Sequence, residues 1–309
     1  MQTAHPSTPV RNAPSVAPAT TDAILAALAY SDVFDWPLSA AEIRSLLTVP
    51  ARQADVAEAI VALTTAGRIE QIEDVFVLFG RTEIAAHRRR RELISARLWP
   101  VAIRYGRWIA AMPFVSMVAV SGSLAVDAAE PDADIDFFVV TEDARLWTTR
   151  AMIIGVVRAA AVGKAAATLC PNYLVTASNM ALVERDLFTA RELAQLVPLY
   201  GGPVLGELLA CNDWFRDFLP NHPGPRPRLM GAPPVIGRRV APLLRRRGFD
   251  RVERWEMARK VAALTALVAD PAIGEALFDE RACKGHLDGH RGRVLDAYEA
   301  RLRALGVGA

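Results

Sequence analysis

Cysteine is scarce in this chain. The 309 residues contain three cysteines, Cys170, Cys211 and Cys283, and no two of them form a CxxC pair. Structural zinc sites and disulfide frameworks both need cysteines at short, recurring spacings. Neither kind of site is therefore expected, and the composition fits a protein of the reducing cytoplasm.

Long apolar runs are absent as well. The most apolar stretch, AMIIGVVRAAAVG at residues 151–163, contains Arg158 and is shorter than the about 20 residues that cross a bilayer. The first 20 residues, MQTAHPSTPVRNAPSVAPAT, lack the continuous apolar core of a secretory signal. We therefore expect no membrane span, a cytoplasmic location and a disordered tail at residues 1–20.

Neither sign of charge is in excess. The 36 basic and 34 acidic residues leave a formal net charge of +2, whereas binding to nucleic acid needs a concentrated basic face. One basic cluster, Arg88 to Arg91, lies in a long helical stretch that Pro100 is expected to kink or split. We interpret the cluster as a solvated helix face, with contact to a polyphosphate or RNA as the alternative.

The sequence does contain enough apolar residues for about two folded domains. Residues 21–82 show three helical segments, with Thr21 or Asp22 predicted to cap the first and Ser39 the second, and then a short hairpin. This arrangement is typical of a winged helix. The third helix, QADVAEAIVALTTAG, carries two acids and no base. It argues against DNA binding and favours a packing or protein-interaction role.

Strand and helix patterns alternate through residues 83–219, which predicts a small mixed sheet with helices. Residues 220–245 are rich in Pro, Gly and Arg and predict a linker, and residues 246–309 predict a helical C-terminal region. The expected fold class is α+β or α/β: a mixed-sheet domain with an N-terminal winged-helix-like domain and C-terminal helices.

Two acids open the apolar strand near residue 135. In an extended strand residues i and i+2 point the same way, so Asp134 and Asp136 project together while Ile135 and Phe137 face the opposite side. Neighbouring carboxylates at the start of a buried strand repel each other and lose hydration, a cost that a cation removes. Mg²⁺ prefers a few carboxylate oxygens together with water and phosphate oxygens, which suits such a pair.

A Gly-Ser pair precedes these acids. Gly122 permits close approach of the backbone to a ligand, and Ser123 stands where the next short helix begins. Backbone N–H groups and a hydroxyl in such a place can hold a terminal phosphate. We therefore expect Asp134 and Asp136 to hold Mg²⁺ on a nucleoside triphosphate whose phosphates contact Gly122 and Ser123.

The order Gly-Ser, a gap of about ten residues, and Asp-apolar-Asp-apolar on a strand resembles the signature of the DNA polymerase β-like nucleotidyltransferases. The resemblance covers residues 112–212 and implies transfer of a nucleoside monophosphate from a nucleoside triphosphate to a hydroxyl acceptor, with release of pyrophosphate. Asp134 and Asp136 would be the catalytic ligands of one or two Mg²⁺ (or Mn²⁺) ions. Gly122 and Ser123 would grip the β and γ phosphates. The acceptor stays open between a protein side chain, an RNA end and a small hydroxylated molecule.

One departure from the pattern matters. Active members of that superfamily usually carry a third carboxylate on the next strand, and here that strand, LCPNYLVT, has no acid. Asn172 occupies the expected place, and an amide cannot accept the acceptor's proton. Glu184 and Asp186 lie further along the chain, and Asp186 is predicted to cap a helix. The alternative is therefore a catalytically degenerate nucleotide-binding or scaffold protein that acts through its winged helix and C-terminal helices.

Overall fold

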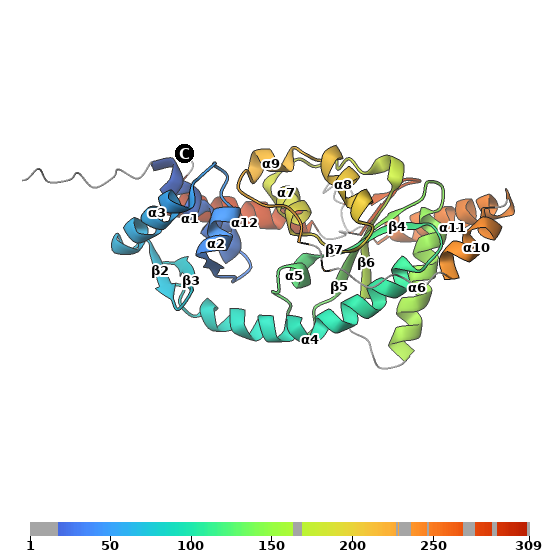
Figure 1. The fold of residues 1–309 in the computed structure, drawn as a ribbon, viewed down its shortest axis with the longest axis horizontal. Helices are drawn as coiled ribbons and strands as arrows, with labels where there is room; N and C mark the ends of the chain where they lie inside the picture. The colour runs from blue at the N-terminus through green and yellow to red at the C-terminus, as the bar shows by residue number, and fades with distance from the viewer. Residues whose placement is uncertain are drawn as a thin grey trace, which may run out of the picture.

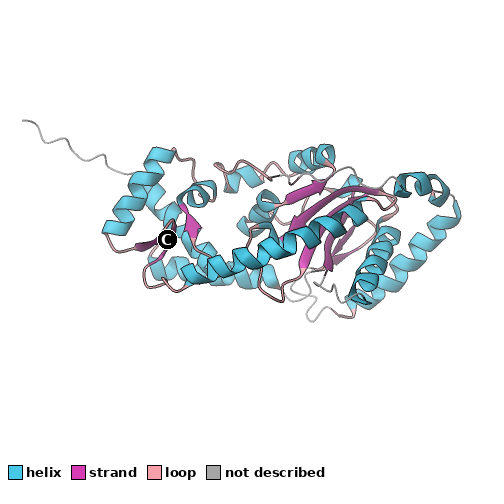
Figure 2. Ribbon diagram, turned by 60° about the horizontal axis from the view of Figure 1, so that its bottom comes forward, coloured by secondary structure: helices cyan, strands magenta, loops and turns pink. Residues whose placement is uncertain are grey.

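The computed structural model describes residues 18–162, 169–226, 228, 236–245, 247–267, 276–285 and 289–307. Almost all of the tail expected at residues 1–20 lies outside these ranges. Within them the fold is mixed α+β, as predicted, with helices around a three-stranded and a six-stranded sheet (Figures 1 and 2). No helix in the described part of the chain is long and apolar enough to cross a bilayer.

An N-terminal unit of helices and a small antiparallel sheet lies at one end of the molecule (Figure 1, blue). The sheet has the order β1-β3-β2. Ser39 caps α2 as predicted, because its hydroxyl accepts the backbone N–H of Glu42 at 3.3 Å and its own N–H donates to the Glu42 carboxylate at 2.7 Å. The predicted start of the first helix was wrong, since α1 already begins at Pro18. The elements of this unit are α1 (Pro18–Asp32), β1 (Leu38–Ser39), α2 (Ala40–Ser45), α3 (Gln53–Thr65), β2 (Ile69–Ile72) and β3 (Val75–Leu78).

One long helix, α4 (Ile84–Ala110), connects the N-terminal unit to the larger sheet (Figure 1). It runs through Pro100 without being split there. A proline ring removes a helical hydrogen bond from the carbonyl four residues earlier, here that of Ala96. Pro100 and Ala96 are both exposed, so water can satisfy that carbonyl.

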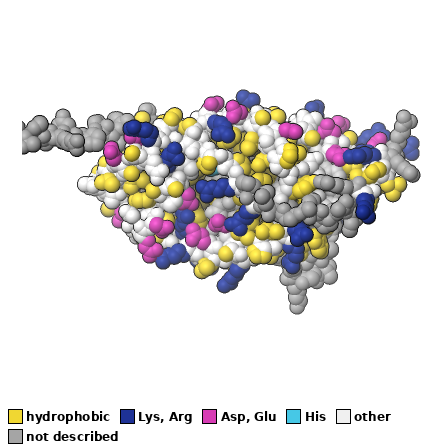
Figure 3. Space-filling view, in the orientation of Figure 1, with side chains coloured by type: hydrophobic (Ala, Val, Ile, Leu, Met, Phe, Trp, Pro, Cys, Tyr) yellow, Lys and Arg dark blue, Asp and Glu magenta, His cyan; other side chains and the backbone are white. Residues whose placement is uncertain are grey.

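The basic cluster on α4 is only in part the solvated face that was expected. Arg89 and Arg90 are exposed, whereas Arg88 and Arg91 are half-buried and hold the N-terminal unit in place. Arg88 donates to Glu42 at 2.7 Å, and its guanidinium lies 4.7 Å from the centre of the Trp36 ring. Arg91 donates to the backbone carbonyl of Phe34 at 2.7 Å and pairs with Glu130, which lies between two strands of the larger sheet. Basic and acidic side chains are also interspersed over the face shown in Figure 3.

The larger sheet has the strand order β7-β4-β5-β6-β9-β8, and β5 and β6 are its parallel pair. The remaining neighbours are antiparallel. The strands are β4 (Val115–Ser121), β5 (Ile135–Thr141), β6 (Leu169–Thr176), β7 (Val197–Tyr200), β8 (Leu277–Phe278) and β9 (Ala282–Lys284). The elements between them are α5 (Gly122–Ala125), α6 (Leu146–Val162), η1 (Ala177–Asn179), α7 (Leu187–Gln195), α8 (Gly202–Cys211) and α9 (Phe215–Phe218).

The two faces of this sheet bury separate cores, as the period of two in a strand requires. One face packs against α4 and α6 through Val118, Val120, Ile135, Phe137 and Val139. The other packs against α7 and α8 through Met117, Ala119, Phe138 and Val140. The expectation that Ile135 and Phe137 face away from Asp136 is therefore confirmed, since Asp136 alternates with them along β5.

The C-terminal part of the chain completes both units. Its elements are α10 (Ile236–Leu244), α11 (Arg247–Thr265), β8, β9 and α12 (His290–Leu305). Residues 246–309 were expected to be helical, yet β8 and β9 extend the large sheet beyond β6. α12 packs on α1, where Arg301 pairs with Asp32 at 2.7 Å, and α10 begins inside the segment that was expected to be a linker.

Glu253 on α11 fastens the C-terminal part to the large sheet. Its buried carboxylate accepts the backbone N–H groups of Trp147 and Thr148, both at 2.7 Å. These N–H groups lie in the first turn of α6, where no earlier carbonyl is available to them. The contact satisfies donors that would otherwise be buried without a partner.

We expect Glu253→Ala to lower the free energy of unfolding by about 1–3 kcal/mol, because two buried N–H groups lose a charged acceptor. Urea unfolding followed by circular dichroism measures the effect. Glu280→Ala, at an exposed position, is the matched control and should change stability by less than about 0.5 kcal/mol. Equal midpoints for the two variants would contradict the assignment of Glu253 as an anchor.

Candidate functional site

The Gly-Ser turn at the end of β4 lies directly against the acidic start of β5. Ser121, the last residue of β4, is the antiparallel partner of Asp136. Gly122 has a φ of +66°, and a Cβ atom placed on it would lie 2.6 Å from Oδ2 of Asp136. Glycine is therefore required twice, for the left-handed backbone and for the space beside the carboxylate. Ser123 follows as the second residue of α5, which spans four residues.

The ionisation of Asp136 depends on its burial and on the neighbouring carboxylate of Asp134. Asp134 is exposed and precedes β5, whereas Asp136 is its second residue and is largely enclosed. Burial and the negative charge of Asp134 raise the pKa of Asp136 to about 7, against an opposing hydrogen bond from the Cys170 thiol. Two carboxylates in this relation favour a proton or a cation between them.

The neighbouring strand places Cys170, rather than Asn172, directly beside the acids. Asp136 pairs with Cys170, but Phe138 pairs with Tyr173, so an additional residue of β6 bulges between these two pairs. Burial and the charges of Asp136 and Asp134 raise the pKa of the Cys170 thiol to about 12. A thiol that stays protonated donates to Asp136 and does not take a proton from a substrate. Sequence reasoning missed Cys170 because the bulge shifts the pairing of β6 with β5, and nothing in the local sequence marks that bulge.

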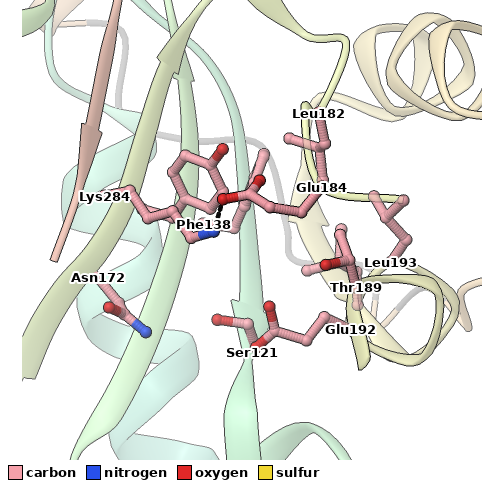
Figure 4. Close-up of a pocket in the computed structure, with 11 residues that line it drawn as sticks. Ser121, Phe138, Asn172, Leu182, Glu184, Thr189, Glu192, Leu193 and Lys284 are labelled. Carbon is pink, nitrogen blue, oxygen red and sulfur yellow. Dashed lines mark hydrogen bonds and ion pairs between the residues drawn. The ribbon is translucent and has the colours of Figure 1, made fainter. Parts of the chain in front are cut away.

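Asn172 instead lines a small pocket next to the acids (Figure 4). Helix α7 covers this pocket, and its interior leaves about 20 Å³ for the centres of water molecules, enough for one or two water-sized groups. Phe138 and Tyr173 form aromatic walls. The residues around it are Ser121, Phe138, Asn172, Tyr173, Leu182, Glu184, Thr189, Glu192, Leu193, Leu196 and Lys284.

The pocket contains two carboxylates. That of Glu184 is paired with a lysine, and that of Glu192 is not. Lys284 on β9 donates to Glu184 at 2.8 Å. Burial alone would raise the pKa of Glu184, but the hydrogen bond and charge of Lys284 outweigh it and hold that pKa below its ordinary value. Burial raises the pKa of Glu192 to about 7, and the charges of Asp136, Asp186 and Glu184 add to the rise while Lys284 opposes it.

Sequence reasoning named Glu184 but missed Glu192 and Lys284. Asp186 caps α7 as predicted, accepting the N–H of Thr189 at 2.9 Å, and Glu192 follows on the same helix. The rarity of lysine in an arginine-rich chain was the one signal that marked Lys284.

The acids present fit a magnesium ion that receives most of its ligands from its substrate. Among the described residues no group of three or more His, Cys, Asp or Glu side chains is arranged to hold a metal. Asp134 and Asp136 offer two carboxylates whose mutual repulsion a divalent cation would relieve. Mg²⁺ commonly takes one or two protein carboxylates and completes its octahedron with water and phosphate oxygens.

Comparisons of the chain with protein-family models, with curated proteins and with solved structures gave no match.

We expect Asp136→Asn to stabilise the protein at pH 8 in the absence of divalent cations. Between its ordinary pKa of 3.8 and the raised value of about 7, the folded state keeps a proton on Asp136 that the unfolded state has lost. The free energy of unfolding of the wild type therefore falls as pH rises through this window. The Asp136→Asn variant has an uncharged amide at this position and does not undergo this decrease. The gain should be about 1–3 kcal/mol at pH 8 and should vanish near pH 4.

Chemical unfolding at a series of pH values measures this difference. Asp132→Asn, at an exposed position two residues before Asp134, is the control and should follow the wild type. A gain for Asp136→Asn that is the same at pH 4 and pH 8 would show that the carboxylate is not electrostatically strained.

Proposed function

We propose that this protein is a nucleotidyltransferase that uses Mg²⁺ (or Mn²⁺) and moves a nucleoside monophosphate from a nucleoside triphosphate to a hydroxyl acceptor, releasing pyrophosphate. The observation that carries the proposal is the contact between the Gly122 backbone and Asp136, where the missing Cβ would lie 2.6 Å from the carboxylate. This contact puts the Gly-Ser turn directly against the enclosed carboxylate of Asp136, which Asp134 precedes by two residues. A metal-bound triphosphate needs a phosphate-binding turn and metal-binding carboxylates close to each other.

Each residue of the Gly-Ser turn and of the two-aspartate motif has a role in this proposal. Asp134 and Asp136 hold the metal, and Gly122 and Ser123 bind the β and γ phosphates through backbone N–H groups and the Ser123 hydroxyl. The metal, when bound, supplies positive charge against the charge that develops on the leaving pyrophosphate. The rest of the catalytic effect is the positioning of the α-phosphorus in line with the acceptor oxygen.

The domain assignment belongs to the same proposal. Residues 83–219, whose sheet is completed by β8 and β9, form the nucleotidyltransferase domain, and residues 21–82 form a winged-helix-like domain. The third helix of the winged-helix-like domain, α3, carries Asp55 and Glu58. Arg52, at the start of α3, is paired with Asp55 at 2.7 Å. This charge pattern supports a packing or protein-binding role for the domain rather than contact with DNA.

A catalytically degenerate nucleotide-binding or scaffold protein is the second candidate. The observation in its favour is that β6 offers Cys170 and Asn172, and no carboxylate, beside Asp136. Such a protein would bind a metal–nucleotide complex without turning it over. The two candidates differ in pyrophosphate release and not in binding.

We expect wild type to bind at least one of ATP, CTP, GTP and UTP in the presence of Mg²⁺ or Mn²⁺ and to release pyrophosphate from it. Asp136→Asn should lower release by at least about 100-fold, because the metal loses a charged ligand. Asp132→Asn should leave both properties unchanged. Thermal shift with each nucleotide measures binding, and a pyrophosphate assay with labelled nucleotide measures turnover.

Two other outcomes decide between the candidates. Metal-dependent binding without any pyrophosphate release would favour the scaffold. Absence of binding to all four nucleotides would contradict both.

A further inference from the structure

Glu192 is the charged side chain of the pocket that has no partner. Its carboxylate makes no hydrogen bond or ion pair with the residues that the structure describes, whereas Glu184 is paired with Lys284. Figure 4 shows the Glu192 carboxylate turned toward Ser121 and away from the Glu184–Lys284 pair. Glu192 is half-buried, and a carboxylate that lines a pocket without a partner is a candidate for a role in binding or catalysis.

Glu192 lies on the same face of the sheet as the metal-binding candidates. Ser121, toward which it points, is the cross-strand partner of Asp136. The charge of Asp136 acts directly on the ionisation of Glu192. Glu192 therefore lines the pocket next to Asp136, on the same side of the sheet, although it comes from α7 and not from β6.

The charges around Glu192 decide which acceptors can enter. Asp136 on β5 and Asp186 and Glu184 before α7 are acids around it, but Glu184 is paired with Lys284 and Asp186 is paired with Arg291. The charge that remains in the pocket lining is the carboxylate of Glu192, so the lining is net negative when Glu192 is ionised, and the interior has space for one or two water-sized groups. A phosphate beside the reacting hydroxyl would be repelled, whereas an uncharged hydroxyl group fits.

We propose that Glu192 is the acceptor-side base of the transfer reaction and that the pocket admits an uncharged hydroxyl group that carries no neighbouring phosphate. This inference rests on the proposed function. In the step, the hydroxyl gives its proton to the Glu192 carboxylate, and its oxygen lone pair forms the new bond to the α-phosphorus. The bond from the α-phosphorus to the bridging oxygen breaks, pyrophosphate leaves with that electron pair, and Glu192 then returns the proton to water.

The same step explains how the chain manages without an acid on β6. Cys170 occupies the place beside Asp136, and burial and the neighbouring carboxylates keep its thiol protonated. Asn172 has no basic atom for the acceptor's proton. Glu192 reaches the same side of the acids from the helix that covers them.

The test compares Glu192→Gln, Glu192→Asp and the control Glu207→Gln, which changes an exposed glutamate on α8. The nucleotide is the one that wild type binds most tightly, and the probe acceptor is glycerol, an uncharged polyol. Titration calorimetry measures nucleotide affinity in Mg²⁺, and labelled nucleotide measures transfer and pyrophosphate release. Urea unfolding verifies that each variant is folded.

We expect Glu192→Gln to keep nucleotide affinity within about threefold of wild type while its kcat falls by at least about 100-fold, the usual effect of removing a general base. Glu192→Asp, which keeps the carboxylate on a shorter stem, should retain part of the rate. Glu207→Gln should match wild type in both measurements.

Three results would overturn the inference, and they are distinguishable. A wild-type rate in Glu192→Gln would remove Glu192 from the reaction while the proposed function stands. Loss of metal–nucleotide binding in Glu192→Gln, to the extent seen in Asp136→Asn, would make Glu192 part of the metal site and not a base. Absence of pyrophosphate release from wild type with every nucleotide would contradict the proposed function itself, and the inference would fail with it.

Discussion

The burial of the Asp136 carboxylate next to Asp134 is the constraint on which the account depends. Burial, and after it the negative charge of Asp134, raise the pKa of Asp136 to about 7. A fold keeps such a pair at a cost in stability unless something positive occupies the space beside it. The backbone of Gly122 fills part of that space, and in the proposed function a cation with phosphate ligands would fill the rest.

The two faces of the large sheet differ: one is structural, and the other carries the candidate site. One face of the sheet packs against α4 and α6 and forms a continuous apolar core. The opposite face has Asp136, Ser121 and the small pocket at one end and an apolar core toward the other. The C-terminal strands β8 and β9 bring Lys284 into this face, and Glu253 anchors the same part of the chain to α6. Segments far apart in the sequence thus fix the electrostatics of one short stretch of β5.

Local sequence signals predicted many of the features that depend on residues close in the sequence. Alternation along β5 correctly assigned opposite sides to Asp136 and Phe137, and the capping signals at Ser39 and Asp186 were correct. The left-handed turn after β4 follows from Gly122. These features depend on period, caps and glycine, which act over a few residues.

Features that depend on distant partners were not predictable in the same way. The arginines of α4 were expected to be solvated, but Arg88 and Arg91 pair with acids of other segments. The strands β8 and β9 are two and three residues long, too short for a periodic signal, and form because β6 offers an open edge. Glu192 has an ordinary helical context, and only the packing of α7 on the sheet turns it toward Ser121.

The most direct test of the central claim is a crystal structure of the protein with Mn²⁺ and a non-hydrolysable nucleoside triphosphate analogue, with the metal located by its anomalous scattering. The account predicts an anomalous peak within coordination distance of both Asp134 and Asp136, bridged to phosphate oxygens that contact the Gly122–Ser123 turn. A metal and nucleotide bound elsewhere, or no peak between the two carboxylates at saturating Mn²⁺, would contradict it.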